Sequence, residues 1–285
     1  MKRLQFIALF CISITIYAQP NTEIFLVDIT KSNEKIEIVN LKNISNNKGY
    51  DNQPSFFDDN TVLFSSTRNG ETDIKNYKIS SGENSWITNT PLGSEFSPLK
   101  IPNQEAISAV RLDKTDLQRL YQYNLADGIF KVLLPDLKVG YHVWFSSTIL
   151  VLTVLVDDRM DLVVSNLREN TSETIQKNVG RSLHKIPNSN LISFISNENG
   201  TSSIKSLDPI AGTIDIITTL PNPIQDICWM TDNIILIPDG KSITQLNIVD
   251  DGVSLLHHFE EDEIKGISRI AVSADGKHLA LVSEE

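Results

Sequence analysis

The clearest unit of the sequence runs from Gly49 to Ile74 and reads GYDNQPSFFDDNTVLFSSTRNGETDI. Short runs of β-branched and aromatic residues alternate here with Asp, Asn and Gly, which is typical of strands joined by tight turns. The Asn69-Gly70 pair supplies the positive φ that such a turn requires. We expect the carboxylate of Asp73 to accept hydrogen bonds from the backbone amides of this turn. The unit predicts β-hairpins, and no sustained helical periodicity follows Gln19.

A glycine in front of an apolar strand recurs along the chain, at Gly49, Gly93, Gly140, Gly180 and Gly266. The gaps are 44, 47, 40 and 86 residues, the last being two units, and the glycine missing from the fifth unit is expected near Pro223. Polar hairpin turns follow the same period, and the segment 66–74 recurs at 196–204. Three markers therefore share one period of about 44 residues.

A repeat of this length with four short strands is the sequence mark of a β-propeller blade. The sequence predicts an all-β fold, a six-bladed β-propeller of four-stranded blades that forms a single domain over residues 19–285. The last unit carries only an inner strand pair and the first residues only an outer pair, so we expect N-terminal outer strands to pair with C-terminal inner strands. The expected blades span about 49–92, 93–138, 139–179, 180–221, 222–263, and 266–285 completed by 22–45.

Within the first full repeat, residues 51–60, residues 62–74 and Gly82 resemble a repeat of the TolB-type propellers. The shared features are the Pro before the inner strand, the Asp-rich hairpin turn, the Arg-Asn-Gly turn and the Asp that opens the third strand. Residues 273–281, SADGKHLAL, are a second match. Proteins built from such repeats serve as periplasmic interaction scaffolds, as sensor domains of serine peptidases and as modules joined to outer-membrane anchoring domains. The resemblance therefore implies an exported propeller that binds a partner.

The first eighteen residues have the order of a secretory signal peptide. Lys2 and Arg3 precede an apolar run that ends at Ala18, and this run is too short for a permanent membrane span. Removing residues 1–18 changes the formal charge from -11 to -13 and leaves Cys228 as the single thiol. Cys228 lies in an apolar stretch, where we expect it to be buried and to pack as a small hydrophobic residue. We expect a periplasmic or secreted protein with no stable membrane span after cleavage.

Composition and motifs exclude several classes of function. A formal charge of -11 argues against nucleic acid as a partner, because phosphate binding needs clustered Lys and Arg. The sequence holds no Gly-x-Ser-x-Gly elbow of a serine hydrolase, and its five histidines lack the spacing of a zinc site. We therefore do not expect catalysis by these mechanisms, and the sequence favours a non-enzymatic role over an enzymatic one.

The residues just after each marker glycine are expected at the mouth of the central channel, which the innermost strands line. This set is polar and mixed in charge, and it is the candidate binding site: Tyr50, Asp51, Glu95, Tyr141, His142, Arg181, Gln225, Asp226 and Arg269. Its carboxylates come from Asp51, Glu95 and Asp226 alone. We expect no cofactor, with calcium in the channel as the alternative.

These observations favour a non-enzymatic exported propeller that binds a protein or a cell-envelope component through the loop face around the channel. One alternative is a metal-assisted hydrolase or lactonase that uses Asp51, Glu95 and His142. Another is a sugar or peptide sensor with aromatic platforms at Tyr50 and Tyr141. The alternatives differ in the ligand that the mouth takes.

Overall fold

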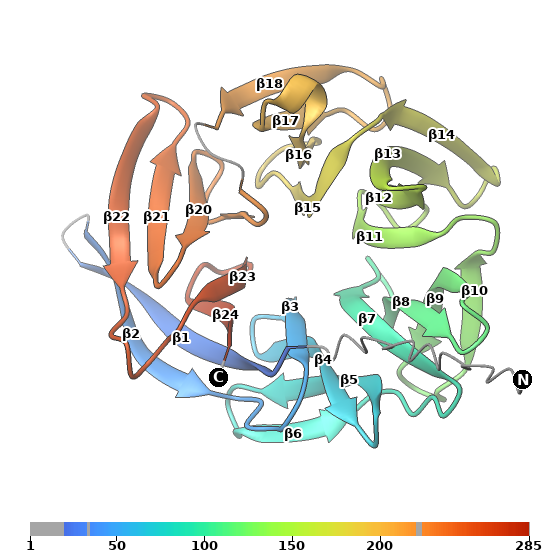
Figure 1. Cartoon of the computed structure of the whole chain (residues 1–285), viewed down its shortest axis with the longest axis horizontal. Helices are drawn as coiled ribbons and strands as arrows, with labels where there is room; N and C mark the ends of the chain where they lie inside the picture. Colours follow the sequence, from blue (N-terminus) through green and yellow to red (C-terminus); the bar gives the residue numbers. More distant parts are fainter. Residues whose placement is uncertain (1–19, 33–34, 221–223, 285) are drawn as a thin grey trace, which may run out of the picture.

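The computed structural model describes residues 20–32, 35–220 and 224–284. Six four-stranded antiparallel sheets stand around a central axis as the blades of a propeller (Figure 1). Over the described ranges the only helical segment is a single 3₁₀ turn, Glu198–Gly200. The predicted all-β, six-bladed propeller is confirmed, whereas the proposed signal peptide lies outside the described residues and stays a prediction.

Five blades are built from consecutive strands. Blade 1 contains β3 (Asp51–Asp58), β4 (Thr61–Arg68), β5 (Glu71–Lys78) and β6 (Glu83–Trp86). Blade 2 contains β7 (Gly93–Lys100), β8 (Ala106–Asp113), β9 (Gln118–Asn124) and β10 (Phe130–Leu134). Blade 3 contains β11 (Val139–Trp144), β12 (Ile149–Val156), β13 (Arg159–Asn166) and β14 (Thr171–Gln176). Blade 4 contains β15 (Val179–Lys185), β16 (Ile192–Ser196), β17 (Ser203–Leu207) and β18 (Ile214–Thr219), and blade 5 contains β19 (Cys228–Trp229), β20 (Ile234–Asp239), β21 (Ser242–Asn247) and β22 (Gly252–His258).

Blade 6 joins the two ends of the described chain. Its strand order is β2 (Lys35–Asn43), β1 (Thr22–Ser32), β24 (His278–Glu284) and β23 (Ile267–Val272). Strands β1 and β24 pair without a register shift from Thr22 opposite Glu284 to Asp28 opposite His278. The predicted closure by N-terminal outer strands and C-terminal inner strands is confirmed, and it leaves no gap in the ring.

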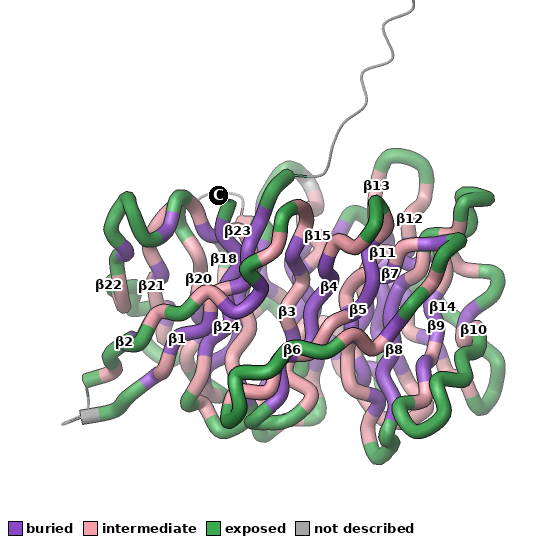
Figure 2. Tube along the Cα trace, turned by 90° about the horizontal axis from the view of Figure 1, so that it is seen from below, coloured by how far each residue is buried: buried purple, intermediate pink, exposed green. Residues whose placement is uncertain are grey.

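The hydrophobic core is divided into six clusters, each between two neighbouring blades. One cluster joins Ile24 and Ala280 of blade 6 to Phe64 of blade 1, and the others repeat this arrangement around the ring. Burial follows the strands, while exposed residues lie at the loops of both faces (Figure 2). Cys228 is 2 % exposed within the cluster between blades 5 and 6, and burial raises the pKa of its thiol, as expected of a packing residue.

Candidate functional site

The nine residues expected at the channel mouth fall into two groups. Tyr50, Tyr141, Arg181 and Arg269 are partly exposed, and Gln225 is exposed. The other four are buried between blades: Asp51, Glu95, His142 and Asp226. The split follows the alternation of side chains along an inner strand, in which neighbouring residues point to opposite faces.

Side chains of the first group meet across the channel. Arg269 Nη2 of blade 6 donates a hydrogen bond of 3.0 Å to the hydroxyl of Tyr141, and its guanidinium carbon lies 5.0 Å from the centre of that ring. Blades 6 and 3 stand on opposite sides of the ring, so this contact spans the channel (Figure 1). Arg181 Nη2 of blade 4 donates to the backbone oxygen of Ser268 at 2.8 Å, and its Nε donates to that of Gln225 at 3.3 Å. The mouth is therefore held by arginines that bridge non-adjacent blades.

The electrostatics of the mouth are those of crowded cations and phenols. Burial raises the pKa of Tyr50 to about 12, an effect that the charge of Arg269 partly offsets. Burial and the neighbouring charge of Arg269 lower the pKa of Arg181. The ring of Tyr50 also packs edge-on against Phe96, with 6.2 Å between the ring centres. The mouth thus places the Tyr50 phenol and two guanidinium groups close together.

The carboxylates of Asp51 and Glu95 lie in two different contacts between blades, and both are 0 % exposed. Asp51 Oδ1 accepts a hydrogen bond of 3.3 Å from Asn47, while Oδ2 has no partner among the described residues. Glu95 accepts a hydrogen bond of 2.9 Å from the hydroxyl of Tyr123. Burial raises the pKa of Asp51 to about 6 and that of Glu95 to about 7.

His142 occupies a third contact, between blades 2 and 3. Its Nε2 lies 2.7 Å from the hydroxyl of Ser108, which also accepts a hydrogen bond of 2.8 Å from Trp144 Nε1. Burial lowers the pKa of His142 to about 3, so the ring is neutral at physiological pH. A neutral and enclosed imidazole serves packing here.

The residues Gln225 and Asp226 connect the mouth to blade 5. Asp226 Oδ2 accepts a hydrogen bond of 3.0 Å from the backbone amide of Ile270, which ties blade 5 to blade 6. Within the described ranges, no group of three or more His, Cys, Asp or Glu side chains is placed to hold a metal ion. Across the same residues, no helix is long and apolar enough to cross a membrane.

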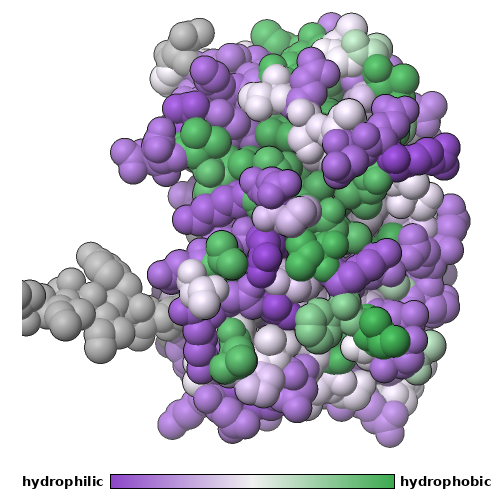
Figure 3. All heavy atoms as spheres, turned by 90° about the vertical axis from the view of Figure 1, so that its right-hand side faces the viewer, coloured by the Kyte–Doolittle hydropathy of each residue, from purple (hydrophilic) through white to green (hydrophobic). Residues whose placement is uncertain are grey.

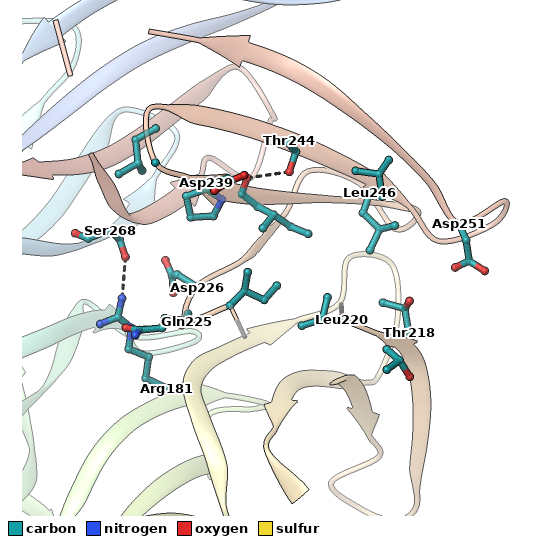
Figure 4. A pocket seen from close by; sticks show the side chains of 17 residues that line it. Arg181, Thr218, Leu220, Gln225, Asp226, Asp239, Thr244, Leu246, Asp251 and Ser268 are labelled. Atoms are coloured by element: carbon teal, nitrogen blue, oxygen red, sulfur yellow. Dashed lines mark hydrogen bonds between the residues drawn. The ribbon is translucent and has the colours of Figure 1, made fainter. Parts of the chain in front are cut away.

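Two cavities adjoin the mouth, and sequence reasoning missed most of their lining. A cavity of about 100 Å³ lies in the channel and includes Gln53 and Ser97, residues of inner strands with φ of 57° and 52°. A cavity of about 800 Å³ lies between blades 4 and 5 and is lined by apolar side chains such as Leu220 and Leu246 together with polar ones such as Arg181 and Asp239 (Figure 4). The missing repeat glycine near Pro223 was the one signal in the sequence that pointed to an irregular blade at this place.

Comparison with known proteins finds solved structures with a similar fold and no matching sequence family. No protein-family model matches the sequence, and no curated protein sequence matches it either. Among solved structures, a protein from Agrobacterium tumefaciens assigned as TolB has a TM-score of 0.71 and 11 % identity, over 94 % of this chain and 99 % of that chain. TolB from Acinetobacter baumannii gives 0.53 and 11 %, over 93 % of this chain and 64 % of that chain. Oligogalacturonate lyase from Vibrio parahaemolyticus gives 0.59 and 10 %, over 87 % and 83 %.

The TolB structures and the lyase share the propeller with this chain at identities near 10 %, so the comparison shows architecture rather than activity. The predicted resemblance is confirmed at that level: the chain has the fold of a TolB-type six-bladed β-propeller.

Proposed function

We propose that this chain is a non-enzymatic propeller that binds a protein or a cell-envelope component through the loop face around the channel mouth. The observation that carries the proposal is the convergence of Tyr50, Tyr141, Arg181 and Arg269 at that mouth. Tyr and Arg are the residue types enriched among those that dominate binding energy at protein interfaces. The bridging contacts hold them in place before a partner arrives, which reduces the entropy lost on binding.

The resemblance in fold to TolB structures supports the same class of function and a location outside the cytoplasm. The signal-like order of residues 1–18 supports export to the periplasm or beyond. Both points belong to the proposal, since the identity to those structures is 11 %.

The alternative of a metal-assisted hydrolase gains no support from the geometry. Asp51, Glu95 and His142 lie in three different contacts between blades, each with its own hydrogen-bond partners. The alternative of a sugar or peptide sensor shares Tyr50 and Tyr141 with the leading proposal, and it differs only in the size of the ligand.

Affinity capture from a crosslinked envelope extract of the source cells tests the proposal. We expect the tagged chain to capture a partner, and we expect Tyr141→Ala to lower the affinity for that partner at least about thirtyfold. This is the effect of losing about 2 kcal/mol at a dominant contact. The matched control is Phe130→Ala, which removes an aromatic ring from outer strand β10, where Phe130 is 54 % exposed. Equal capture by wild type and Tyr141→Ala, with both folded by circular dichroism, would refute the proposal.

A further inference from the structure

A third cavity opens at the channel mouth, on the side of blades 2 and 3. Strands of these two blades form most of its wall, and Gln53 of β3 and Arg181 of β15 complete it from blades 1 and 4. Every lining residue lies within the described ranges. Its volume is about 250 Å³, somewhat below the roughly 300–1,000 Å³ of pockets that hold drug-sized ligands. The cavity therefore suits a small molecule and is too small for a folded partner.

The wall of this cavity is apolar, with one cation and no carboxylate. Its apolar side chains are Phe96, Val110, Leu155 and Met160. Arg181 is the one charged residue of the lining. The Nε2 of Gln118 donates a hydrogen bond of 2.7 Å to the backbone oxygen of Val139, which ties blade 2 to blade 3 and leaves Gln118 Oε1 as an acceptor. A ligand that fills the cavity therefore needs an apolar body.

The channel cavity of about 100 Å³ meets this cavity at a shared corner, because Gln53, Tyr141 and Arg181 line both. The channel cavity adds Arg269 and the carboxylate of Asp226, so two guanidinium groups stand against one carboxylate. The hydrogen bonds of both guanidinium groups go to two backbone oxygens and one phenol, and none goes to a carboxylate within residues 20–32, 35–220 and 224–284. The corner has an excess of one positive charge.

The histidines of the channel cavity do not change this balance. Burial lowers the pKa of His142 to about 3, and burial also lowers the pKa of His184. Both rings are therefore neutral at physiological pH. An excess of one positive charge suits a ligand with a single negative charge.

The three residues of the shared corner each hold a hydrogen-bond donor that has no acceptor among the described residues. Arg181 donates from Nε and Nη2 to backbone oxygens, which leaves Nη1. The hydroxyl of Tyr141 accepts from Arg269, and its own proton has no acceptor. Gln53 Oε1 accepts from the backbone amide of Ser97 at 2.8 Å, which fixes the orientation of the carboxamide and leaves Nε2. The corner therefore calls for an acceptor.

A β-bulge in the inner strand of blade 1 places Gln53 at this corner. The register of β3 against β4 shifts between Asn52 and Ser55, and the φ of Gln53 is 57°. Bulges re-aim a side chain, and positive φ at residues other than glycine is concentrated at ligand sites. The bulge brings the Gln53 carboxamide to blade 2, where its oxygen meets the amide of Ser97. The strained backbone thus serves to present a donor to the channel.

We propose that the shared corner binds a small organic monocarboxylate, with its carboxylate at Gln53, Tyr141 and Arg181 and its apolar body in the cavity between blades 2 and 3. A carboxylate accepts charge-assisted hydrogen bonds from all three donors and neutralises the excess positive charge, whereas the matched amide leaves that charge in place. The inference goes beyond the proposed function, because the ligand is a free small molecule that binds in the absence of a protein partner.

Ligand-observed NMR titration of the purified chain tests this proposal. The probes are butyrate, hexanoate, octanoate and 3-phenylpropionate, each also as its amide, together with acetate, which lacks an apolar body. We expect the tightest of the longer acids to bind with a Kd below about 1 mM. We expect its amide and acetate to bind at least about tenfold more weakly, equivalent to about 1.4 kcal/mol.

Two Gln→Glu substitutions separate the site from the net charge of the protein. Gln53→Glu keeps an oxygen for the amide of Ser97 and replaces the Nε2 donor with a negatively charged oxygen. Gln122→Glu adds the same charge on β9, where Gln122 donates to Gln104 at 3.2 Å and lines neither cavity. We expect Gln53→Glu to weaken binding of the acid at least about tenfold and Gln122→Glu to change it less than about twofold. Circular dichroism checks that both variants fold.

Several outcomes would overturn the inference: no acid bound up to about 1 mM, equal affinity of acid and amide, acetate as tight as the longer acids, or unchanged binding by folded Gln53→Glu. The comparison of acid with amide uses the unaltered chain, so it decides the proposal even if Gln53→Glu does not fold. Partner capture that depends on Tyr141, without acid binding, would refute this inference alone. Acid binding without any captured partner would refute the proposed function and leave this inference in place.

Discussion

Glu95 and Asp73 form a buried pair of acids at the contact between blades 1 and 2. The sequence predicted that Asp73 accepts hydrogen bonds from the amides of its own turn, and the turn does have the expected positive φ at Asn69 and Gly70. Asp73 instead accepts from the guanidinium of Arg68 at 2.7 Å and from the backbone amide of Thr90 at 3.0 Å. The turn geometry depends on two adjacent residues, whereas the amide of Thr90 belongs to a loop seventeen residues away from Asp73.

The raised pKa of Glu95 makes stability depend on pH. The folded state holds the proton up to about pH 7, against about 4.5 for an ordinary Glu, so the neutral acid contributes stability below about pH 4.5 that is lost as the pH rises toward 7. Glu95→Gln keeps a neutral side chain at all pH values. We expect the free energy of unfolding of this variant, relative to wild type, to rise by roughly 2–3 kcal/mol between pH 4.5 and 8. Urea unfolding at several pH values measures it, and a difference independent of pH would contradict the assignment.

Ser97 offers a stabilising substitution. Its φ is 52°, a region that favours glycine, and its buried hydroxyl has no partner among the described residues. We expect Ser97→Gly to raise the free energy of unfolding by about 1 kcal/mol, because relief of strain and of the unpaired hydroxyl exceeds the entropy cost of glycine.

Urea unfolding measures this change, with Ser55→Gly as the control. Ser55 donates a hydrogen bond to the backbone oxygen of Pro98 and has no positive φ, so its replacement is expected to destabilise. Destabilisation by Ser97→Gly would show that the unpaired hydroxyl and the positive φ carry little energy.

At the level of elements, the sequence predicted how the N-terminal and C-terminal strands pair, but it did not predict the cavity between blades 4 and 5. A final repeat with only inner strands and a first segment with only outer strands left one consistent pairing, which β1 and β24 make. This cavity lies beside the short strand β19 and is lined in part by Pro238 of β20, and it forms only where the two neighbouring blades meet. Similarly, side chains alternate in direction along the inner strands, so Tyr50 and Arg181 lie at the mouth while the next residue of each strand is buried. The spacing of the repeats alone does not make this distinction.

The closing strand β1 is expected to carry much of the stability of the ring. Ile24 is 0 % exposed between blades 6 and 1, whereas Val39 on outer strand β2 is 37 % exposed. We expect Ile24→Ala to lower the free energy of unfolding by about 2–5 kcal/mol, and Val39→Ala by less than about 1 kcal/mol. Urea unfolding compares the two variants. Equal, small effects would mean that closure contributes little to the fold.

At the scale of the whole molecule, six interblade clusters hold together a closed ring that has two kinds of exposed surface. One is the polar and aromatic channel mouth, and the other is the outer side of the ring, where hydrophobic residues gather in patches among hydrophilic ones on the face shown in Figure 3. Leu125, Ile129 and Phe130 of blade 2 are among the exposed apolar residues. Exposed apolar patches mark binding surfaces in many proteins, so the side of the ring competes with the mouth as the place where a partner binds.

Site-directed photo-crosslinking in source cells separates these two surfaces. A benzoylphenylalanine is placed at position 50 or 141 of the mouth, or at position 130 on the side of the ring, in otherwise identical chains. Our account predicts one discrete crosslinked partner from positions 50 and 141 and none from position 130. A partner crosslinked from position 130 alone would contradict the assignment of the channel mouth as the binding face.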